Sequence, residues 1–185
     1  MNEKPILFNS EMVNAILSGR KTQTRRIIKL DHERGMVNPV VRGRNGEISS
    51  ITCRLAPMLC PLGQPGDQLW VRETFGKYRA APLGFVYRAD GELPCGDPER
   101  WTPSIHMPRW ASRINLLITG VRVERLQSIT LGDICKEIGC GLYDFRPATY
   151  GFQVWEELWK SIYGEESWQA NPWVWVINFE RMEAK

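Results

Sequence analysis

The segment from Arg113 to Leu126 most constrains the fold, because its apolar residues change sides at a glycine. They occupy even-numbered positions before Gly120 and odd-numbered positions after it, namely Ile114, Leu116, Ile118, Val121 and Val123. Such a shift of parity is typical of a β-bulge or of a bend in a barrel strand. We therefore expect a long strand that bends at Gly120.

Shorter patterns on either side of this strand predict an α+β domain that spans residues 1–185. We expect further strands at 4–8, 68–74, 84–89 and 173–182, and helices at 11–18, 130–138 and 150–162. Ser10 and Thr130 are expected to cap the first two helices, and Gly19 and Gly164 to follow helix ends. Residues 31–65 and 76–112 are rich in glycine, proline and charge, which predicts two long excursions. Bent strands with peripheral helices favour a small, partly closed β-barrel.

Composition narrows the class of protein further. The net charge of +3 permits a nucleic-acid or nucleotide partner without demanding one. The sequence has no apolar run of about 20 residues that could span a membrane and no signal-peptide run, so a cytoplasmic location is expected. Five cysteines without a CxxC spacing indicate free thiols. Even with His32 and His106 added, the spacings are irregular, so we expect neither a metal nor another cofactor.

A basic turn follows the first predicted helix and carries the groups most suited to chemistry. Within the run Gly-Arg-Lys-Thr-Gln-Thr-Arg-Arg stand four cations and two hydroxyls, namely Arg20, Lys21, Thr22, Thr24, Arg25 and Arg26. In one interpretation the arginines and hydroxyls bind phosphate. In the other, neighbouring cations lower the pKa of Lys21, which becomes a general base for a threonine hydroxyl. A carboxylate from elsewhere in the chain would then orient the lysine.

Four residues of this turn resemble a known signature. Gly19, Lys21, Thr24 and Arg26 match the Gly-x-Lys-x-x-Glu-x-Arg motif of ASCH domains, with threonine in place of glutamate. ASCH domains are PUA-like β-barrels associated with RNA. The threonine variant is similar to the small bacterial amidohydrolases that remove the acetyl group from N4-acetylcytidine. That resemblance implies that Lys21 and Thr24 belong to a catalytic Lys/Thr/Glu set.

A second match implies the third member of the set. The small enzymes have a Leu-x-x-Leu-Thr segment followed by a helix that bears the glutamate, and the same offset from residues 126–130 leads to Glu137. This chain is longer than those enzymes and in that respect resembles ASCH-type proteins of phages and prophages. Within a strand, Lys21 and Thr24 would point to opposite faces. They can meet only if Lys21 lies on the turn or a bulge intervenes, and Thr22 is otherwise the competing hydroxyl.

The second excursion and the strand before it hold the other candidate binding residues. Residues 101–110 carry two indoles, an imidazole and a guanidinium, from Trp101, Trp110, His106 and Arg109. These groups suit stacking on a base and contact with a phosphate, although tryptophans also anchor loops. Glu73 is either a pocket carboxylate or, as we prefer, an ion-pair partner of Arg72.

Three functions remain open from the sequence. The first is an amidohydrolase in which Lys21 is the base, Thr24 the nucleophile, Glu137 the orienting carboxylate, and Arg26 or a backbone N–H the oxyanion donor. The second is a non-catalytic module that binds a nucleoside or single-stranded RNA. The third is a ribonuclease that uses the same basic residues.

Overall fold

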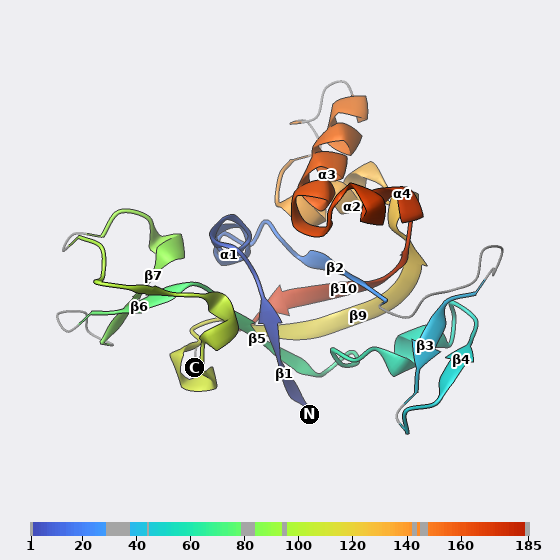
Figure 1. Ribbon diagram of the computed structural model, residues 1–185, viewed down its shortest axis with the longest axis horizontal. Coiled ribbons are helices and arrows are strands. Elements are labelled where there is room, and N and C mark those ends of the chain that lie inside the picture. The colour runs from blue at the N-terminus through green and yellow to red at the C-terminus, as the bar shows by residue number, and fades with distance from the viewer. Residues whose placement is uncertain are drawn as a thin grey trace.

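The computed structural model describes residues 2–28, 38–43, 45–78, 84–93, 96–141, 144 and 148–183. Its centre is a five-stranded sheet in the order β1 (Glu3–Leu7), β5 (Gln68–Arg72), β9 (Asn115–Arg125), β10 (Trp173–Arg181) and β2 (Gln23–Ile27). β1 and β5 are parallel, and the other neighbours are antiparallel. The α-helices labelled in Figure 1 gather on one side of the sheet. The mixed α+β class is confirmed.

The expected barrel is not found as a closed structure among the described strands. β1 and β2 are the outer strands, and no backbone pairing joins them in the described part of the sheet. A side chain links them instead, because Nη2 of Arg26 in β2 donates to the carbonyl oxygen of Leu7 in β1 at 2.9 Å.

The predicted bend in the long strand is present in β9. Asn178 of β10 lies opposite Gly120, and the next residue, Phe179, lies opposite Ile118, which leaves Thr119 as the extra residue of a bulge. A Cβ at position 120 would lie 3.2 Å from Nδ2 of Asn178. Glycine therefore allows the two strands to approach closely at this point.

Among the described residues, four α-helices accompany the sheet, and their capping residues were predicted in part. α1 (Ser10–Leu17) is capped by Asn9, whose Oδ1 accepts from the amide of Met12 at 2.8 Å, so the prediction of Ser10 was wrong by one residue. Thr130 caps α2 (Leu131–Ile138) as expected. α3 (Ala148–Tyr163) is followed by a short helix that was not expected, α4 (Glu165–Ala170).

β10 is apolar on both faces and therefore separates two hydrophobic clusters. Trp175, Ile177 and Phe179 join the cluster around β1, β5 and α1. Val174 and Val176 join the cluster formed with α2 and α3, which contains Trp155 and Trp159, each 2% exposed. Both tryptophans are core residues, as predicted.

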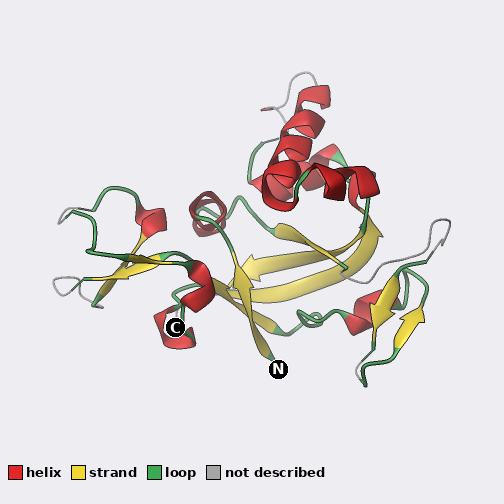
Figure 2. Ribbon diagram, in the orientation of Figure 1, coloured by secondary structure: helices red, strands yellow, loops and turns green. Residues whose placement is uncertain are grey.

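The two excursions contain small sheets of their own (Figure 2). The first holds β3 (Val40–Arg42), β4 (Ile48–Ser50) and a 3-10 helix at Ala56–Leu59. The second holds β6 (Phe75–Lys77), β7 (Phe85–Tyr87) and β8 (Trp101–Thr102), packed around a third hydrophobic cluster. Within the described residues, no helix has the length and apolar character needed to cross a membrane.

Candidate functional site

Lys21 lies on the turn between α1 and β2, and the fold buries it. Gly19 permits the turn because its φ of +74° is one that residues with side chains rarely adopt. The amides of Arg20 and Lys21 both donate to the carbonyl oxygen of Ala15 at 2.9 Å, which folds the chain back over the helix end. Only 2% of Lys21 is exposed. Since Lys21 precedes the strand, the strand alternation does not force it away from Thr24.

Glu137 reaches Lys21 from the last turn of α2. Nζ of Lys21 donates to the carbonyl oxygens of Glu137, at 2.5 Å, and of Gln23, at 2.8 Å. It also lies 3.7 Å from Oε1 of Glu137. The helix can approach this closely because it ends at Gly139, where a Cβ would lie only 2.8 Å from Cβ of Ala15. The structure thus brings together a lysine and a carboxylate that are 116 residues apart in the sequence.

Arg25 holds the Glu137 carboxylate in place. The backbone N–H of Arg25 donates to Oε1 of Glu137 at 2.7 Å, and its Nη1 donates to Oε2 at 3.2 Å. The same guanidinium pairs with Glu124 at 2.5 Å and Asp133 at 3.5 Å. Arg25 is 1% exposed, so the prediction that it binds a phosphate needs correction. Strand alternation turns it toward α2, where carboxylates surround it.

The surroundings of Lys21 lower its pKa toward neutral pH, where the amine can lose a proton. Burial lowers the pKa of Lys21 to about 8, the neighbouring carboxylate of Glu137 raises it, and the charges of Arg26 and Arg25 lower it again. A neutral amine has two N–H groups and one lone pair. The carbonyls of Gln23 and Glu137 accept those two N–H groups, so the lone pair is left to take a proton.

Thr24 lies on the opposite face of β2 from Arg25 and contacts Arg26. Its side-chain Oγ1 accepts from Nη1 of Arg26 at 2.7 Å, and the residue is 1% exposed. In the described part of the chain, no hydrogen bond joins Lys21 to Thr24 directly. Lys21 and Arg26, the hydrogen-bond partner of Thr24, both lie over the ring of Phe8, with Nζ of Lys21 5.6 Å and Cζ of Arg26 5.2 Å from its centroid.

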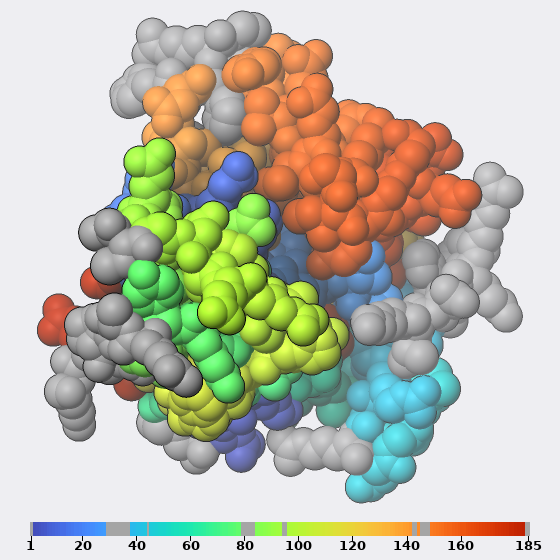
Figure 3. Space-filling model, turned by 60° about the vertical axis from the view of Figure 1, so that its left-hand side comes forward, coloured from blue at the N-terminus to red at the C-terminus, as the bar shows by residue number. Residues whose placement is uncertain are grey.

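A cavity of 390 Å³ adjoins these groups. Its wall comes from the β1–α1 loop, β2, α2, α3 and the second excursion, through Leu7, Phe8, Asn9, Met12, Arg25, Arg26, Thr74, Ser104, Glu137, Trp155, Leu158, Trp159, Ile162 and Tyr163. Figure 3 shows blue N-terminal residues between the yellow-green second excursion and orange α3. Lys21 and Thr24 lie one layer behind this wall, where they contact Glu137 and Arg26.

Two donors beside the cavity lack partners among the described residues. They are Nε1 of Trp155 and Nε of Arg25, both buried, and the Arg25 guanidinium lies 5.8 Å from the Trp155 ring. An unmet buried donor costs about 1–3 kcal/mol, so such groups favour a partner with an acceptor atom. The aromatic wall and these donors together suit a planar ligand that carries carbonyl oxygens or ring nitrogens.

Other residues predicted for this site lie elsewhere. Arg20 is exposed, and its Nε donates to Oγ of Ser18 at 2.9 Å. The backbone N–H of Thr22 donates to the carbonyl oxygen of Lys136 at 3.1 Å, which helps to attach the turn to α2. Neither side chain lines the cavity.

The sequence predicted an ion pair between Glu73 and Arg72, but Glu73 pairs with Arg113 instead. Glu73 is 1% exposed and accepts two hydrogen bonds from Arg113, each at 3.0 Å. Arg72 stacks on Trp70, with its Cζ 4.7 Å from the ring centroid, and donates to the carbonyl oxygen of Ile105. Adjacent residues of a strand point to opposite faces, and this separates Arg72 from Glu73.

The predicted stacking residues of the second excursion lie on the surface, apart from the cavity wall. His106 is exposed, Arg109 pairs with Glu3 at 2.5 Å, and Trp110 is 69% exposed with its ring 5.6 Å from that of Phe85. Ser104 of the same segment does line the cavity. The excursion therefore contributes to the wall through a residue that the sequence did not single out.

Sequence reasoning also missed the acidic groups that surround Arg25. Glu124 and Asp133, with the amide of Gln23, join Arg25 and Arg122 in one network, in which Arg25 and Gln23 are buried and the others are partly exposed. One signal was available, because Asp133 and Glu137 stand four residues apart and so share a face of α2. Nothing in the sequence showed that this face would cover β2.

The structure describes four of the five cysteines, and Cys53, Cys60, Cys135 and Cys140 are free thiols. Within the described ranges, no group of three or more histidines, cysteines or acidic residues is placed to hold a metal ion. Cys95 and His32 lie outside the described residues.

The sequence matches no model of a known protein family and no curated protein at a significant level. Two solved structures resemble the fold. One is hypothetical protein PH0355, with 13% identity and a TM-score of 0.44 over 98% of this chain and all of the other. The second is protein EF3133 from Enterococcus faecalis V583, of family DUF984, with 12% identity and a TM-score of 0.44 over 98% of this chain and 80% of the other. These likenesses are distant, and the site is interpreted from its own geometry.

Proposed function

We propose that this protein is an amidohydrolase that acts on a nucleoside such as N4-acetylcytidine. The observation that carries the proposal is the environment of Lys21, which is 2% exposed, has a pKa lowered to about 8 and lies 3.7 Å from a fixed carboxylate. A buried lysine in this state is typical of a general base. The resemblance of the turn to the ASCH amidohydrolases supports the same chemistry.

In the proposed chemistry Thr24 is the nucleophile and Lys21 the base. Neutral Lys21 takes the hydroxyl proton as Oγ1 attacks the amide carbonyl carbon, and Arg26 stabilises the negative charge that develops. The C–N bond breaks when the lysine returns the proton to the leaving amine. Water then hydrolyses the threonine ester, again with Lys21 as base, and releases acetate. Glu137 keeps the amine oriented throughout.

Arg26 has a second role in this scheme, because its guanidinium separates Thr24 from the cavity. The substrate carbonyl reaches Oγ1 only when the guanidinium moves from its position between Thr24 and the Leu7 carbonyl. The same movement carries its positive charge toward the carbonyl oxygen. Binding of the acyl group and stabilisation of the oxyanion are thereby coupled.

The cavity fits a nucleobase in size and in chemistry. Its 390 Å³ falls within the range of about 300–1,000 Å³ typical of small-molecule sites. Phe8, Trp155, Trp159 and Tyr163 offer apolar surfaces to a planar ring. We also propose that the five-stranded sheet corresponds to the PUA-like barrel frame, with Arg26 bridging the gap between its outer strands.

The direct test is chromatography of N4-acetylcytidine after incubation with the purified protein and its variants. Wild-type protein should release cytidine, and Lys21→Ala and Thr24→Val should not. Lys136→Ala, which removes an exposed lysine from the same helix as Glu137, is the matched control and should keep full turnover. Full turnover by Lys21→Ala would disprove the proposal.

Binding of RNA without chemistry is the second candidate, favoured by one surface of the second excursion. Arg72 and Arg109 both lie over the Trp70 ring, at 4.7 and 5.8 Å, and Trp110 nearby in sequence is 69% exposed. Such a module should bind single-stranded RNA with an affinity that falls steeply with salt and survives Lys21→Met. Cleavage of that RNA during the same incubation would instead indicate a ribonuclease.

A further inference from the structure

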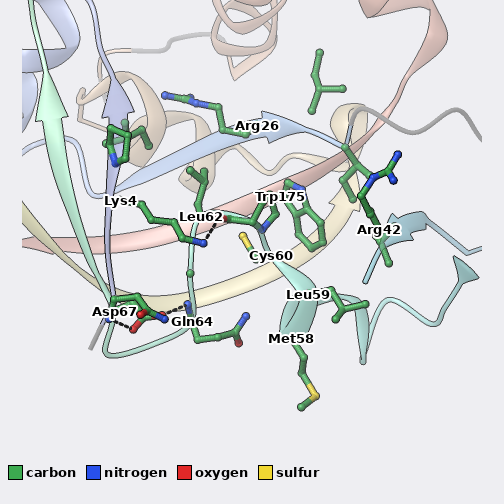
Figure 4. Close-up of a pocket in the computed structure, with 18 of the residues that line it drawn as sticks. Lys4, Arg26, Arg42, Met58, Leu59, Cys60, Leu62, Gln64, Asp67 and Trp175 are labelled. Atoms are coloured by element: carbon green, nitrogen blue, oxygen red, sulfur yellow. Dashed lines mark hydrogen bonds between the residues drawn. The ribbon is translucent and has the colours of Figure 1, made fainter. Parts of the chain in front are cut away.

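A second and larger cavity lies on the other side of Arg26. It has a volume of 1030 Å³ and separates the outer strands of the sheet from the first excursion. Strands β1 and β2 form one wall, and β3 with the 3-10 helix at Ala56–Leu59 forms the other. Figure 4 shows Trp175 and Cys60 near its centre, with Lys4, Arg26 and Arg42 around them. We call this cavity the basic groove.

The basic groove adjoins the candidate active site through two shared residues. Leu7 and Arg26 line both cavities, and the hydrogen bond from Nη2 of Arg26 to the Leu7 carbonyl oxygen lies where the cavities meet. Nη1 of the same guanidinium donates to Thr24. A ligand that fills the active-site cavity and extends past Arg26 therefore enters the basic groove.

The charges of the groove favour an anionic ligand. Lys4, Arg26 and Arg42 line it, and within the described residues none of them has a carboxylate at ion-pair distance. Among the described residues, their side chains donate to backbone carbonyls and to the Thr24 hydroxyl. Asp67 is the one carboxylate of the wall among the described residues; it accepts from the backbone N–H groups of Asn2 and Gln64, and its charge acts on Lys4. Within the described residues the groove therefore has three cations and one carboxylate, whereas Arg25 at the candidate site is surrounded by three carboxylates.

The remaining wall is apolar and includes an exposed side chain. Met58 is 63% exposed, and Leu59, Leu62 and Val41 complete the surface around the buried Trp175. Cations at the edge and apolar side chains within suit a ligand that alternates charged and planar apolar parts. Single-stranded nucleic acid has this character, with phosphates along the backbone and bases that pack on apolar and aromatic surfaces.

We propose that the basic groove binds nucleotides flanking the reacting one, so that the substrate is a modified nucleotide within single-stranded RNA. This inference rests on the proposed function, because it assigns one nucleoside to the active-site cavity. The groove has about 2.6 times the volume of that cavity, which allows two or three further nucleotides. Lys4 and Arg42 contact their phosphates, and Arg26 lies at the junction between the groove and the reacting base.

The test measures binding and hydrolysis separately. The probe is a fluorescently labelled five-nucleotide RNA with N4-acetylcytidine at its centre, titrated against protein carrying Lys21→Ala so that no turnover interferes. Binding should be at least tenfold tighter than that of free N4-acetylcytidine. Adding Lys4→Gln and Arg42→Gln should remove most of this gain and leave binding of the free nucleoside unchanged.

Salt dependence and a charge-matched control distinguish phosphate contacts in the groove from a general effect of lost positive charge. Loss of two phosphate contacts should reduce the slope of log affinity against log salt by about 1.4 for a single strand. Lys77→Gln with Arg100→Gln removes two exposed cations that do not line the groove, and should change neither quantity. Thermal melting of both double variants, with Arg42→Gln alone as a milder change, distinguishes lost contacts from lost folding.

The outcomes separate this inference from the proposed function. Equal binding of the pentamer and the free nucleoside, or equal losses in the groove and control variants, would overturn the inference. Binding of cytidine 5′-monophosphate as tightly as the pentamer would also overturn it, because a single phosphate would then suffice. Groove-dependent binding of the pentamer without any release of acetate by the wild type would refute the amidohydrolase, and with it the assignment of RNA as a substrate, and would leave the groove as a binding site for RNA.

Discussion

Two buried glutamates in this protein are held by arginines in different ways. Glu73, 1% exposed, receives both of its hydrogen bonds from Arg113, and Arg113 also pairs with Asp90 at 2.7 Å. Glu137, 4% exposed, shares Arg25 with two other carboxylates, faces Lys21 and lines a cavity. The first arrangement pairs two groups with each other, whereas the second places a lysine with a lowered pKa one layer behind the wall of a cavity. Burial of a carboxylate alone does not distinguish the two sites, and the proposal of chemistry at Glu137 rests on the lysine beside it.

Exchanging each glutamate for glutamine gives the largest expected contrast. Glu137→Gln keeps an acceptor for the Arg25 amide but removes the charge that orients Lys21, so turnover of N4-acetylcytidine should fall by about 10²–10³-fold. Glu73→Gln should leave turnover unchanged and lower the free energy of unfolding by about 3 kcal/mol, because it breaks a buried ion pair. Initial rates and urea denaturation of both variants measure the two effects. Equal loss of turnover in the two variants would show that Glu137 and Glu73 do not differ in their importance for activity.

Of the two glutamate sites, the one at Glu137 should make folding stability depend on pH, through the titration of Lys21. The pKa of Lys21 is lowered from 10.5 to about 8 by burial, so between these values the unfolded chain binds a proton that the folded chain does not. Folding stability should therefore rise with pH from about 8 to about 10.5, by on the order of 1–3 kcal/mol. Lys21→Met should remove this rise. Urea denaturation at pH 7.5, 9 and 10.5 provides the measurement, and parallel curves for both proteins would contradict the account.

The surface pair of Arg109 with Glu3 should give the smallest effect. Both side chains are about two-fifths exposed, and ion pairs of this kind contribute about 0–1 kcal/mol. Arg109→Ala should therefore shift the thermal midpoint only slightly and leave nucleoside turnover intact. A large loss of turnover in this variant would move the functional surface from the cavity to the second excursion.

Features that depend on neighbouring residues were predictable from the sequence. The parity shift at Gly120 located the bulge in β9, and Thr130 capped α2 as its position before an amphipathic segment indicated. Gly19 ended the first helix and left Lys21 on a turn, the position that its encounter with Glu137 requires. These features follow from backbone preferences that act over a few residues.

Partners of charged residues were harder to predict, because they depend on which elements cover each strand. Arg25 looked like an exposed cation of a basic turn, yet α2 and β9 place three carboxylates around it. Glu73 pairs with Arg113, which is 40 residues away, rather than with the adjacent Arg72. The cavity wall combines six separate stretches of the chain, and local patterns do not report such an assembly.

The pH dependence of kcat/KM for N4-acetylcytidine tests the central claim most directly, since it reports the protonation of the free enzyme's base. The account predicts an acid limb with an inflection near pH 8 in the wild type, where Lys21 loses its proton. In Glu137→Gln the inflection should move to lower pH, because the carboxylate that raises the pKa of Lys21 is gone. A profile that is flat from pH 6 to 9, or one that the variant does not shift, would show that Lys21 is not the base.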